Sequence, residues 1–313
     1  MTAARCSEQE FIATLERHGT KKTAKILDID ETSVRQRRRR LEKNLGIMIT
    51  VPGLRNDRVP SEAEGRLHTK IWDGCAIIGS DAHFWPGVTN PAFEAMLILA
   101  KKLQPKIVIM NGDALDFPKI SRHARIGWED EPEVYAEIIA GQENLTRLEA
   151  AAPNAERYWP LGNHDARFET RLSNDAPDYA NIYGFHLKDH FPYWRPCESV
   201  WFNEAVVVKH RYRGGVHAVW NNVVHAGKTI VTGHLHNLQV RPYNDYNGIR
   251  WGVDTGTLAN PYGPQFEYME DNPRNWRSGF IVLFFEQGEL RWPQVCHIIS
   301  DERAEFRGES FEI

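Results

Sequence analysis

Two histidines stand two residues apart in the stretch VTGHLHNL, residues 231–238, directly after a β-branched run. Side chains at positions i and i+2 share one face of an extended chain, so His234 and His236 can reach one polar pocket. By itself the pair fits a metal site and an ordinary strand end equally well. The remaining motifs of the chain decide between these two interpretations.

Four other groups of polar residues end apolar runs upstream of this pair. In chain order they are Asp81 and His83 in SDAH, Asp113 and Asp116 in NGDALDF, Asn163, His164 and Asp165 in GNHD, and His210 after AVVVK. Loops beyond the carboxyl ends of strands are where α/β sheets build their sites. Each motif alone occurs frequently by chance. Five motifs in order, each at the end of an apolar run, indicate that these residues share one metal site.

The order D-x-H, G-D-x-x-D, G-N-H-D, a lone His and G-H-x-H resembles the signature of the calcineurin-like metallophosphoesterases, over about residues 75–240. The resemblance implies an α/β fold of two packed β-sheets flanked by helices, with two divalent metal ions at the strand ends. It assigns the first metal to Asp81, His83, Asp113 and His236, and the second to Asp113, Asn163, His210 and His234. Asp113 would bridge the two ions.

These donors suit a particular chemistry. Imidazole and carboxylate ligands fit Mn, Fe, Zn or Ni, and the absence of thiolates argues against a closed structural zinc site. Two cations about 3.5–4 Å apart can acidify a shared water and neutralise phosphoryl oxygens. The resulting hydroxide would attack phosphorus in line with the leaving oxygen. The expected reaction is therefore hydrolysis of a phosphate ester.

The resemblance also implies a catalytic pair. His164 matches the histidine that protonates or hydrogen-bonds the leaving oxygen, and Asp116 matches the aspartate that orients it. A carboxylate raises the pKa of a neighbouring imidazole and so favours its acid form. Asp165 has two open roles, supporting the metal ligands from behind or capping the following helix.

The fourth motif departs from the family pattern, because His210 is followed by Arg211 where many members have glycine. His217 and His225 remain alternative ligands at this point. Arg167 and Arg211 lie near motifs and are candidates for binding the substrate phosphate. The alternative for each is an ordinary surface or ion-paired arginine.

The elements that must position these residues alternate between two patterns. Short apolar runs predict strands at residues 75–80, 106–112 and 156–162, and helical patterns occupy 90–103 and part of 131–151. After about residue 198 strands dominate, interrupted by one helix in VHAVWNNVVHAG. This alternation predicts an α/β layered domain over residues 71–313.

Residues 1–45 have a different character, with three short helical patterns and a turn at LDID, where Asp30 is a suitable N-cap. The third pattern carries six cations: Arg35, Arg37, Arg38, Arg39, Arg40 and Lys43. The segment resembles the small all-α helix-turn-helix domains of resolvase-like proteins, which implies binding to DNA through the basic helix. A solvated helix face or an acidic protein partner is the alternative. Residues 46–70 lack periodicity and predict a linker.

Charge is divided unevenly along the chain. Residues 1–58 carry 13 Lys+Arg and 8 Asp+Glu, whereas residues 59–313 carry 25 Lys+Arg and 34 Asp+Glu. The overall composition, with 42% hydrophobic and 26% charged residues, is ordinary for a globular protein. No apolar run is long enough to cross a membrane, and no secretory signal is visible. Four widely spaced cysteines predict neither a zinc framework nor disulfides, which favours the reducing cytoplasm.

Three functions are compatible with these features. The first is a metal-dependent nuclease or phosphodiesterase that its N-terminal domain directs to nucleic acid. The second is a phosphomonoesterase acting on a protein or nucleotide. The third is a DNA-binding regulator with a non-catalytic phosphoesterase body, which the complete ligand set and the His164–Asp116 pair disfavour.

Overall fold

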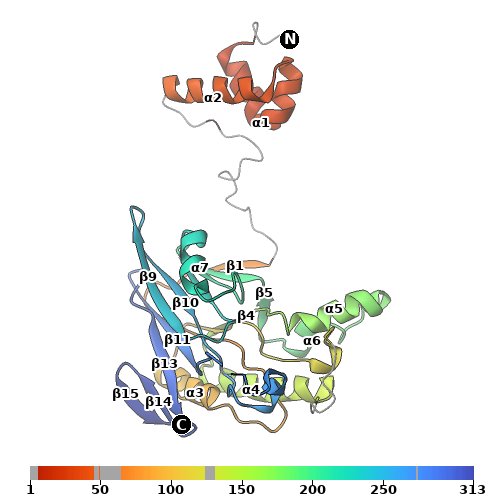
Figure 1. Ribbon diagram of the computed structural model, residues 1–313, viewed down its shortest axis with the longest axis vertical. Helices are drawn as coiled ribbons and strands as arrows, with labels where there is room; N and C mark the ends of the chain where they lie inside the picture. Colours follow the sequence, from red (N-terminus) through yellow and green to blue (C-terminus); the bar gives the residue numbers. More distant parts are fainter. Residues whose placement is uncertain (1–5, 46–48, 50–64, 124–130, 273) are drawn as a thin grey trace. The chain divides into compact units, whose positions relative to one another are not determined.

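The computed structural model describes residues 6–45, 49, 65–123, 131–272 and 274–313, except the side chains of Glu42 and Lys43. The chain divides into two compact units, Met1–Glu64 (the N-terminal unit) and Gly65–Ile313 (the body) (Figure 1). Within the predicted linker of residues 46–70, Arg66–Thr69 form strand β1 of the body, paired in parallel with β6 (Ser199–Phe202). The linker prediction is therefore too long at its carboxyl end, because tertiary pairing and not local propensity makes this strand.

The N-terminal unit contains helices α1 (Glu8–Leu27) and α2 (Glu31–Leu45). Gly19 interrupts α1 with φ 71° and ψ 168°, so two helical stretches meet at a kink. Asp30 Oδ1 accepts a hydrogen bond of 2.8 Å from the Ser33 N–H, as expected for the residue that caps α2. The three predicted helical stretches are confirmed. Their small core includes Phe11, Leu15, Ala24, Leu27, Val34 and Leu41.

The body contains two β-sheets. The smaller sheet has the order β1-β6-β7-β8-β10-β9, where β7 is Val206–Val208, β8 is Thr229–Thr232, β9 is Gln239–Asp245 and β10 is Gly248–Asp254. The larger sheet has the order β15-β14-β13-β11-β2-β3-β4-β5, with β12 (Glu289–Leu290) paired to β11. Its other strands are β2 (Gly74–Gly79), β3 (Ile107–Met110), β4 (Glu156–Pro160), β5 (Arg195–Cys197), β11 (Gly279–Glu286), β13 (Gln294–Ser300), β14 (Arg303–Phe306) and β15 (Glu309–Glu312).

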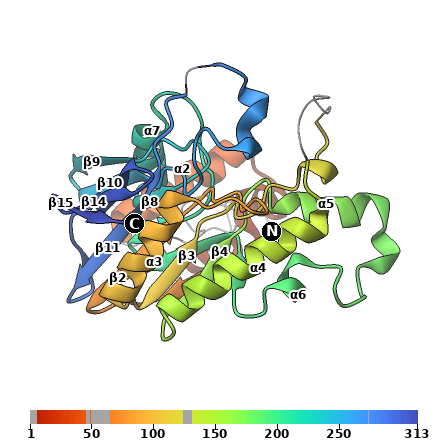
Figure 2. The same ribbon diagram turned by 90° about the horizontal axis from the view of Figure 1, so that it is seen from below.

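The two sheets pack face to face, and helices cover their outer faces (Figures 1 and 2). Alternate residues of the central strands, such as Ile78 and Ile109 in one sheet and Val208 and Val231 in the other, meet in a buried core. Helices α3 (Pro91–Leu103) and α4 (Val134–Ala151) pack on the larger sheet, and α7 (Ala218–Ala226) packs on the smaller sheet. The predicted sandwich of two sheets flanked by helices is confirmed.

Shorter elements occupy the loops of the body. They are η2 (Pro118–Ile120), α5 (Ala166–Asp175), η3 (Pro177–Tyr179), α6 (Leu187–His190) and η4 (Pro264–Met269). Strands β2, β3 and β4 are mutually parallel, as are β7 and β8. Their carboxyl ends carry all five sequence motifs. Among the described residues, no helix combines the length and the apolarity that a membrane span requires.

Candidate metal centre

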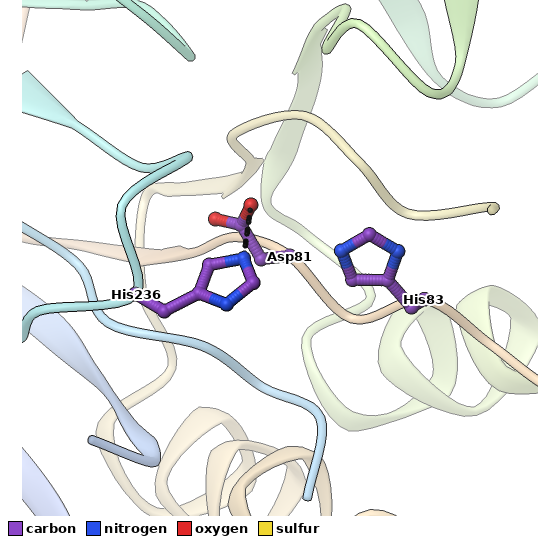
Figure 3. A group of neighbouring side chains, drawn as sticks. All are labelled: Asp81, His83 and His236. Carbon is purple, nitrogen blue, oxygen red and sulfur yellow. Dashed lines mark hydrogen bonds and ion pairs between the residues drawn. The ribbon is translucent and has the colours of Figure 1, made fainter. Parts of the chain in front are cut away.

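The first group of ligand candidates joins the loop after β2 to the loop after β8. Ligand atoms of Asp81, His83 and His236 lie within 4.8 Å of one another, and all three residues are buried. His236 Nε2 lies 3.0 Å from Asp81 Oδ1, and the ring of His83 lies beside the same carboxylate (Figure 3). Asp81 and His236 are 155 positions apart in the sequence, so the fold has assembled this group.

The second group combines the loops after β3, β7 and β8. Ligand atoms of Asp113, His210 and His234 also lie within 4.8 Å of one another. His210 is buried, whereas His217 and His225 are exposed at the two ends of α7. His210 is therefore the histidine that the fold brings to this group. Asp113 belongs to this group and not to the first, so its bridging role stays a prediction.

Several ligand atoms are buried without a hydrogen-bond partner, as a metal site requires. Nδ1 of His83 pairs with Asp116 at 2.9 Å, and Nδ1 of His210 pairs with the carbonyl of Asn111 at 2.8 Å. The Nε2 atom of His83 is left buried and without a hydrogen bond, and so is Oδ1 of Asn163. Nε2 of His210 faces only the carboxylate of Asp113, another ligand candidate. An acceptor on one ring nitrogen fixes the tautomer that presents the other nitrogen to a cation. The residues present thus fit a pair of divalent metal ions.

The electrostatic field of the site also favours a cation. Burial alone lowers the pKa of His210, but the Asp113 and Asp81 carboxylates outweigh burial and raise that pKa to about 10. His210 Nε2 lies 3.0 Å from Asp113 Oδ2. A proton or a metal ion placed there would satisfy the same negative charge.

The backbone of the site is bent into an uncommon conformation. Asp81, His83, Asp113, His234 and His236 all have φ between 40° and 71°. Non-glycine residues rarely adopt left-handed backbone, and such strain clusters at functional sites. Gly162 allows the loops to approach closely, because a Cβ there would lie 2.0 Å from Asp113 Oδ1.

His164 and Asp116 form the expected pair beside the two ligand groups. His164 Nδ1 lies 2.6 Å from Asp116 Oδ1, and the backbone N–H of His164 donates to Asp113 Oδ1 at 2.8 Å. Burial alone lowers the pKa of His164, but the carboxylates of Asp113 and Asp116 outweigh it and raise the pKa. Its acid form is thereby favoured, as general acid catalysis needs.

Asp165 braces the loops from behind. Its carboxylate is fully buried and accepts hydrogen bonds from the backbone N–H groups of Asp113, Leu115 and Gly162, at 2.7, 3.1 and 2.9 Å, and from Trp159 Nε1. It makes no side-chain capping bond to α5. Of its two open roles, the structure selects support of the site.

Two further buried carboxyl groups that sequence reasoning missed also hold the loops. Glu137 Oε1 accepts from the backbone N–H groups of Asp116 and Phe117 at 3.2 and 2.8 Å. Asp254 Oδ1 accepts from the N–H of Asn237 at 3.0 Å. Burial raises the pKa of Glu137 to about 8 and that of Asp254 to about 7. Glu137 lies on the buried stripe of α4, where a charged residue was a usable signal.

Aromatic residues that sequence reasoning also missed form a wall over the first ligand group. The Phe266 ring lies 5.1 Å from the His83 ring and 5.7 Å from the His236 ring. Trp276 contacts His236 at 4.4 Å and Phe266 at 5.0 Å between ring centroids. These rings therefore pack directly against two imidazoles of the first ligand group.

A cavity of about 350 Å³ opens beside the second ligand group, and Asn163 and His234 line it. Four arginines share its walls: Arg122, Arg167, Arg171 and Arg211. The two predicted phosphate-binding arginines therefore lie at one cavity. Arg167 Nη1 also donates to the Asp116 carbonyl at 2.8 Å, and Arg171 pairs with Asp175 at 2.6 Å.

The arginines of the basic helix α2 differ from one another in their exposure to solvent. Arg35, Arg39 and Arg40 are exposed, although Arg35 also pairs with Glu31 at 3.0 Å. Arg37 lies 4.5 Å over the Phe11 ring and donates to the Cys6 carbonyl at 2.7 Å, so it is tied to the N-terminal unit. Arg38 is half-buried. The Lys43 side chain lies outside the described part of the chain.

Comparison with known proteins gives remote likenesses to solved structures. No protein-family model and no curated protein matches the sequence. Solved structures that resemble it include YfcE, a phosphoesterase from E. coli (18% identity, TM-score 0.34, covering 70% of this chain and 97% of that chain). They also include the Pseudomonas putida nuclease MPE (16% identity, TM-score 0.32, covering 70% of this chain and 86% of that chain). A dimetal phosphatase from Danio rerio is a third (10% identity, TM-score 0.34, covering 78% of this chain and 99% of that chain).

Proposed function

We propose that the body is a dinuclear-metal phosphoesterase that hydrolyses phosphodiesters of nucleic acid. The observation that carries this proposal is the meeting of two His/Asp ligand groups, with buried unpartnered ligand atoms, beside the hydrogen-bonded pair of His164 and Asp116. The arginine-lined cavity at the second group suits an anionic substrate.

Each part of the site has a role in this proposal. Metal ions held by the two groups would act as Lewis acids on the phosphoryl oxygens and lower the pKa of water. His164 donates a proton to the leaving oxygen, and Asp116 orients the imidazole and stabilises its charge. Arg167 and Arg211 bind the non-bridging oxygens and hold the substrate in the cavity.

The N-terminal unit brings the enzyme to DNA in this proposal. Its exposed Arg35, Arg39 and Arg40 lie on one basic helix, and residues 1–58 carry an excess of positive charge. Phosphate contacts by such residues supply affinity without sequence preference. The contacts that tie Arg37 to Phe11 and Cys6 leave the exposed three as the proposed DNA contacts.

The test is a matched panel of esters on the full-length protein. After dialysis against EDTA, Mn(II), Fe(II), Zn(II) or Ni(II) is added singly, and hydrolysis of bis-p-nitrophenyl phosphate and p-nitrophenyl phosphate is followed. We expect metal-dependent turnover that favours the diester. Preference for the monoester would indicate a phosphomonoesterase. No turnover with any of the four metals would refute the proposal that the protein is a metal-dependent phosphoesterase.

A further inference from the structure

The loop after β7 carries an aromatic residue between cations, in the run Lys209, His210, Arg211, Tyr212 and Arg213. Tyr212 is 43% exposed, which leaves part of its ring open to a ligand. Lys209 Nζ lies 5.5 Å and the Arg213 guanidinium carbon 5.7 Å from the ring centroid. Both distances lie within the limit of about 6 Å for cation–π contacts.

We propose that this loop is a stacking platform for single-stranded nucleic acid, with Tyr212 receiving a base of the strand that crosses the metal centre. The inference rests on the proposed function and names the form of its substrate. Every base has a π-face, and a cationic groove with an aromatic side chain is the usual combination that binds single strands. Duplex bases are already stacked on one another and offer no free face to a tyrosine.

Tyr212 lies close in the chain to the second ligand group, which includes His210. Tyr212 follows His210 by two residues, so their Cα atoms are at most roughly 7 Å apart. A nucleotide whose phosphate reaches the second ligand group therefore has its neighbours within reach of the Tyr212 ring. The exposed Arg213 side chain can move from the ring to a phosphate when a base takes its place.

The surface is hollowed on both sides of Arg211. One side is the arginine-lined cavity that includes Arg122 and Arg171. The other side is a second cavity, of about 420 Å³, lined in part by Lys209, His210 and Arg211. A small monoester would fill one of these cavities, whereas a polymer of phosphates can lie along both. This gathering of cations contrasts with the excess of acidic residues in the body as a whole.

The loop is anchored at both ends, as a platform must be. The N–H of Lys209 donates to the Val231 carbonyl at 3.0 Å, and the N–H of Gly233 donates to the His210 carbonyl at 2.8 Å. The N–H of Arg213 donates to Oδ1 of the buried Asn222 at 3.1 Å. Tyr212 therefore sits on backbone that is fixed before a strand arrives, which reduces the entropy lost on binding.

The experiment compares Tyr212→Ala with Tyr212→Phe, which keeps the ring, and with Tyr246→Ala, which removes a fully exposed tyrosine of the β9–β10 turn. Full-length proteins in Mn(II) are assayed for kcat and KM on a labelled dT20 strand, on a duplex of the same length and on bis-p-nitrophenyl phosphate. Loss of one base stack is worth about 1–3 kcal/mol, so Tyr212→Ala should raise KM for dT20 by roughly fivefold or more.

The pattern of effects distinguishes the platform from a structural role. The increase in KM should be several times larger for dT20 than for either other substrate, and Tyr212→Phe and Tyr246→Ala should stay near wild type. Equal losses on all three substrates, or equal effects of Tyr212→Ala and Tyr212→Phe, would overturn the platform. If the wild type hydrolyses none of them, the proposed function fails, and fluorescence anisotropy of dT20 still tests the platform by itself.

Discussion

Asp116 uses a single carboxylate oxygen to hold two histidines of different function. Its Oδ1 lies 2.6 Å from Nδ1 of His164 and 2.9 Å from Nδ1 of His83. His83 is a ligand candidate of the first group, whereas His164 is the proposed general acid. The metal centre and the proton donor are thereby coupled through one buried carboxylate, and substitutions on either side of it should have different consequences.

His164→Ala should remove the proton donor and leave the metal ligands in place. General acid catalysis contributes about 10²–10⁴-fold, so kcat on a dT20 strand, whose alkoxide leaving group needs a proton, should fall by that order. The loss on bis-p-nitrophenyl phosphate should be smaller, because p-nitrophenolate leaves without protonation. Metal content, measured by inductively coupled plasma mass spectrometry, should remain near that of wild type. His225→Ala, which removes an exposed histidine of α7, is the control. Parallel loss of metal would show that His164 is a ligand.

Asp116→Asn should affect both functions at once. The variant loses the charge that holds the His83 and His164 tautomers, and loss of such supporting partners typically costs about 10–100-fold in metal affinity or activity. We expect weaker metal binding in a chelator competition together with a lower kcat at saturating metal. The exposed Asp178→Asn should change neither. Normal metal affinity in Asp116→Asn would contradict the coupling.

Gly162→Ala should damage the second ligand group. Its added Cβ would lie 2.0 Å from Asp113 Oδ1 and 2.4 Å from the Asp113 backbone nitrogen, so the loop must shift. We expect loss of bound metal, measured on the purified protein, with its Tm falling when metal no longer stabilises the folded state. Gly214→Ala meets no atom within 4 Å and is the matched control. Full metal occupancy in Gly162→Ala would argue against this loop as part of the site.

Glu137→Gln should reduce the loss of stability at high pH. Burial raises the pKa of Glu137 to about 8 from an ordinary value of 4.5, so the folded state binds more protons than the unfolded state between those values. Stability must therefore fall as pH rises from about 4.5 to 8. Relative to Glu137→Gln, wild type should lose on the order of 1–3 kcal/mol between pH 5 and 8.

Urea unfolding followed by tryptophan fluorescence measures this difference in the body alone, because all ten tryptophans lie beyond residue 64. Glu133→Gln, at an exposed site one turn earlier, is the control. If the free energy of unfolding depends on pH in the same way for wild type and Glu137→Gln, then ionisation of the Glu137 carboxyl does not destabilise the folded state.

Replacing Arg35, Arg39 and Arg40 with alanine should weaken binding to duplex DNA and flatten its salt dependence. Each phosphate contact that is lost lowers the slope of log K against log salt by about 0.9. A control with the same change in charge replaces three exposed lysines of α1, Lys21, Lys22 and Lys25. If the two triple variants have equal slopes, the effect is one of overall charge and not of this helix. If the slope of the arginine variant equals that of wild type, this helix does not contact DNA.

The sequence predicted the elements whose patterns are local. Apolar runs identified β2, β3 and β4, and the polar residues directly after them identified the candidate ligands. Strand β1 depends on a tertiary partner, β6, and has no strong local pattern. Asp254 escaped detection because its importance comes from backbone groups distant in sequence, whereas the charged Glu137 on the buried stripe of α4 was a signal that sequence reasoning left unused. The predicted bridging of two metals by Asp113 likewise depends on distances that motifs do not contain, and it stays a prediction.

The position of strand β1 has a mechanical consequence for the body. The chain that leaves the N-terminal unit enters the body as this edge strand, in parallel register with β6, within the sheet whose strands β7 and β8 lead to His210, His234 and His236. A force applied along β1 would load its hydrogen bonds to β6 in shear, where they share the force. Strand β1 thus belongs to the same sheet that carries three of the candidate ligands.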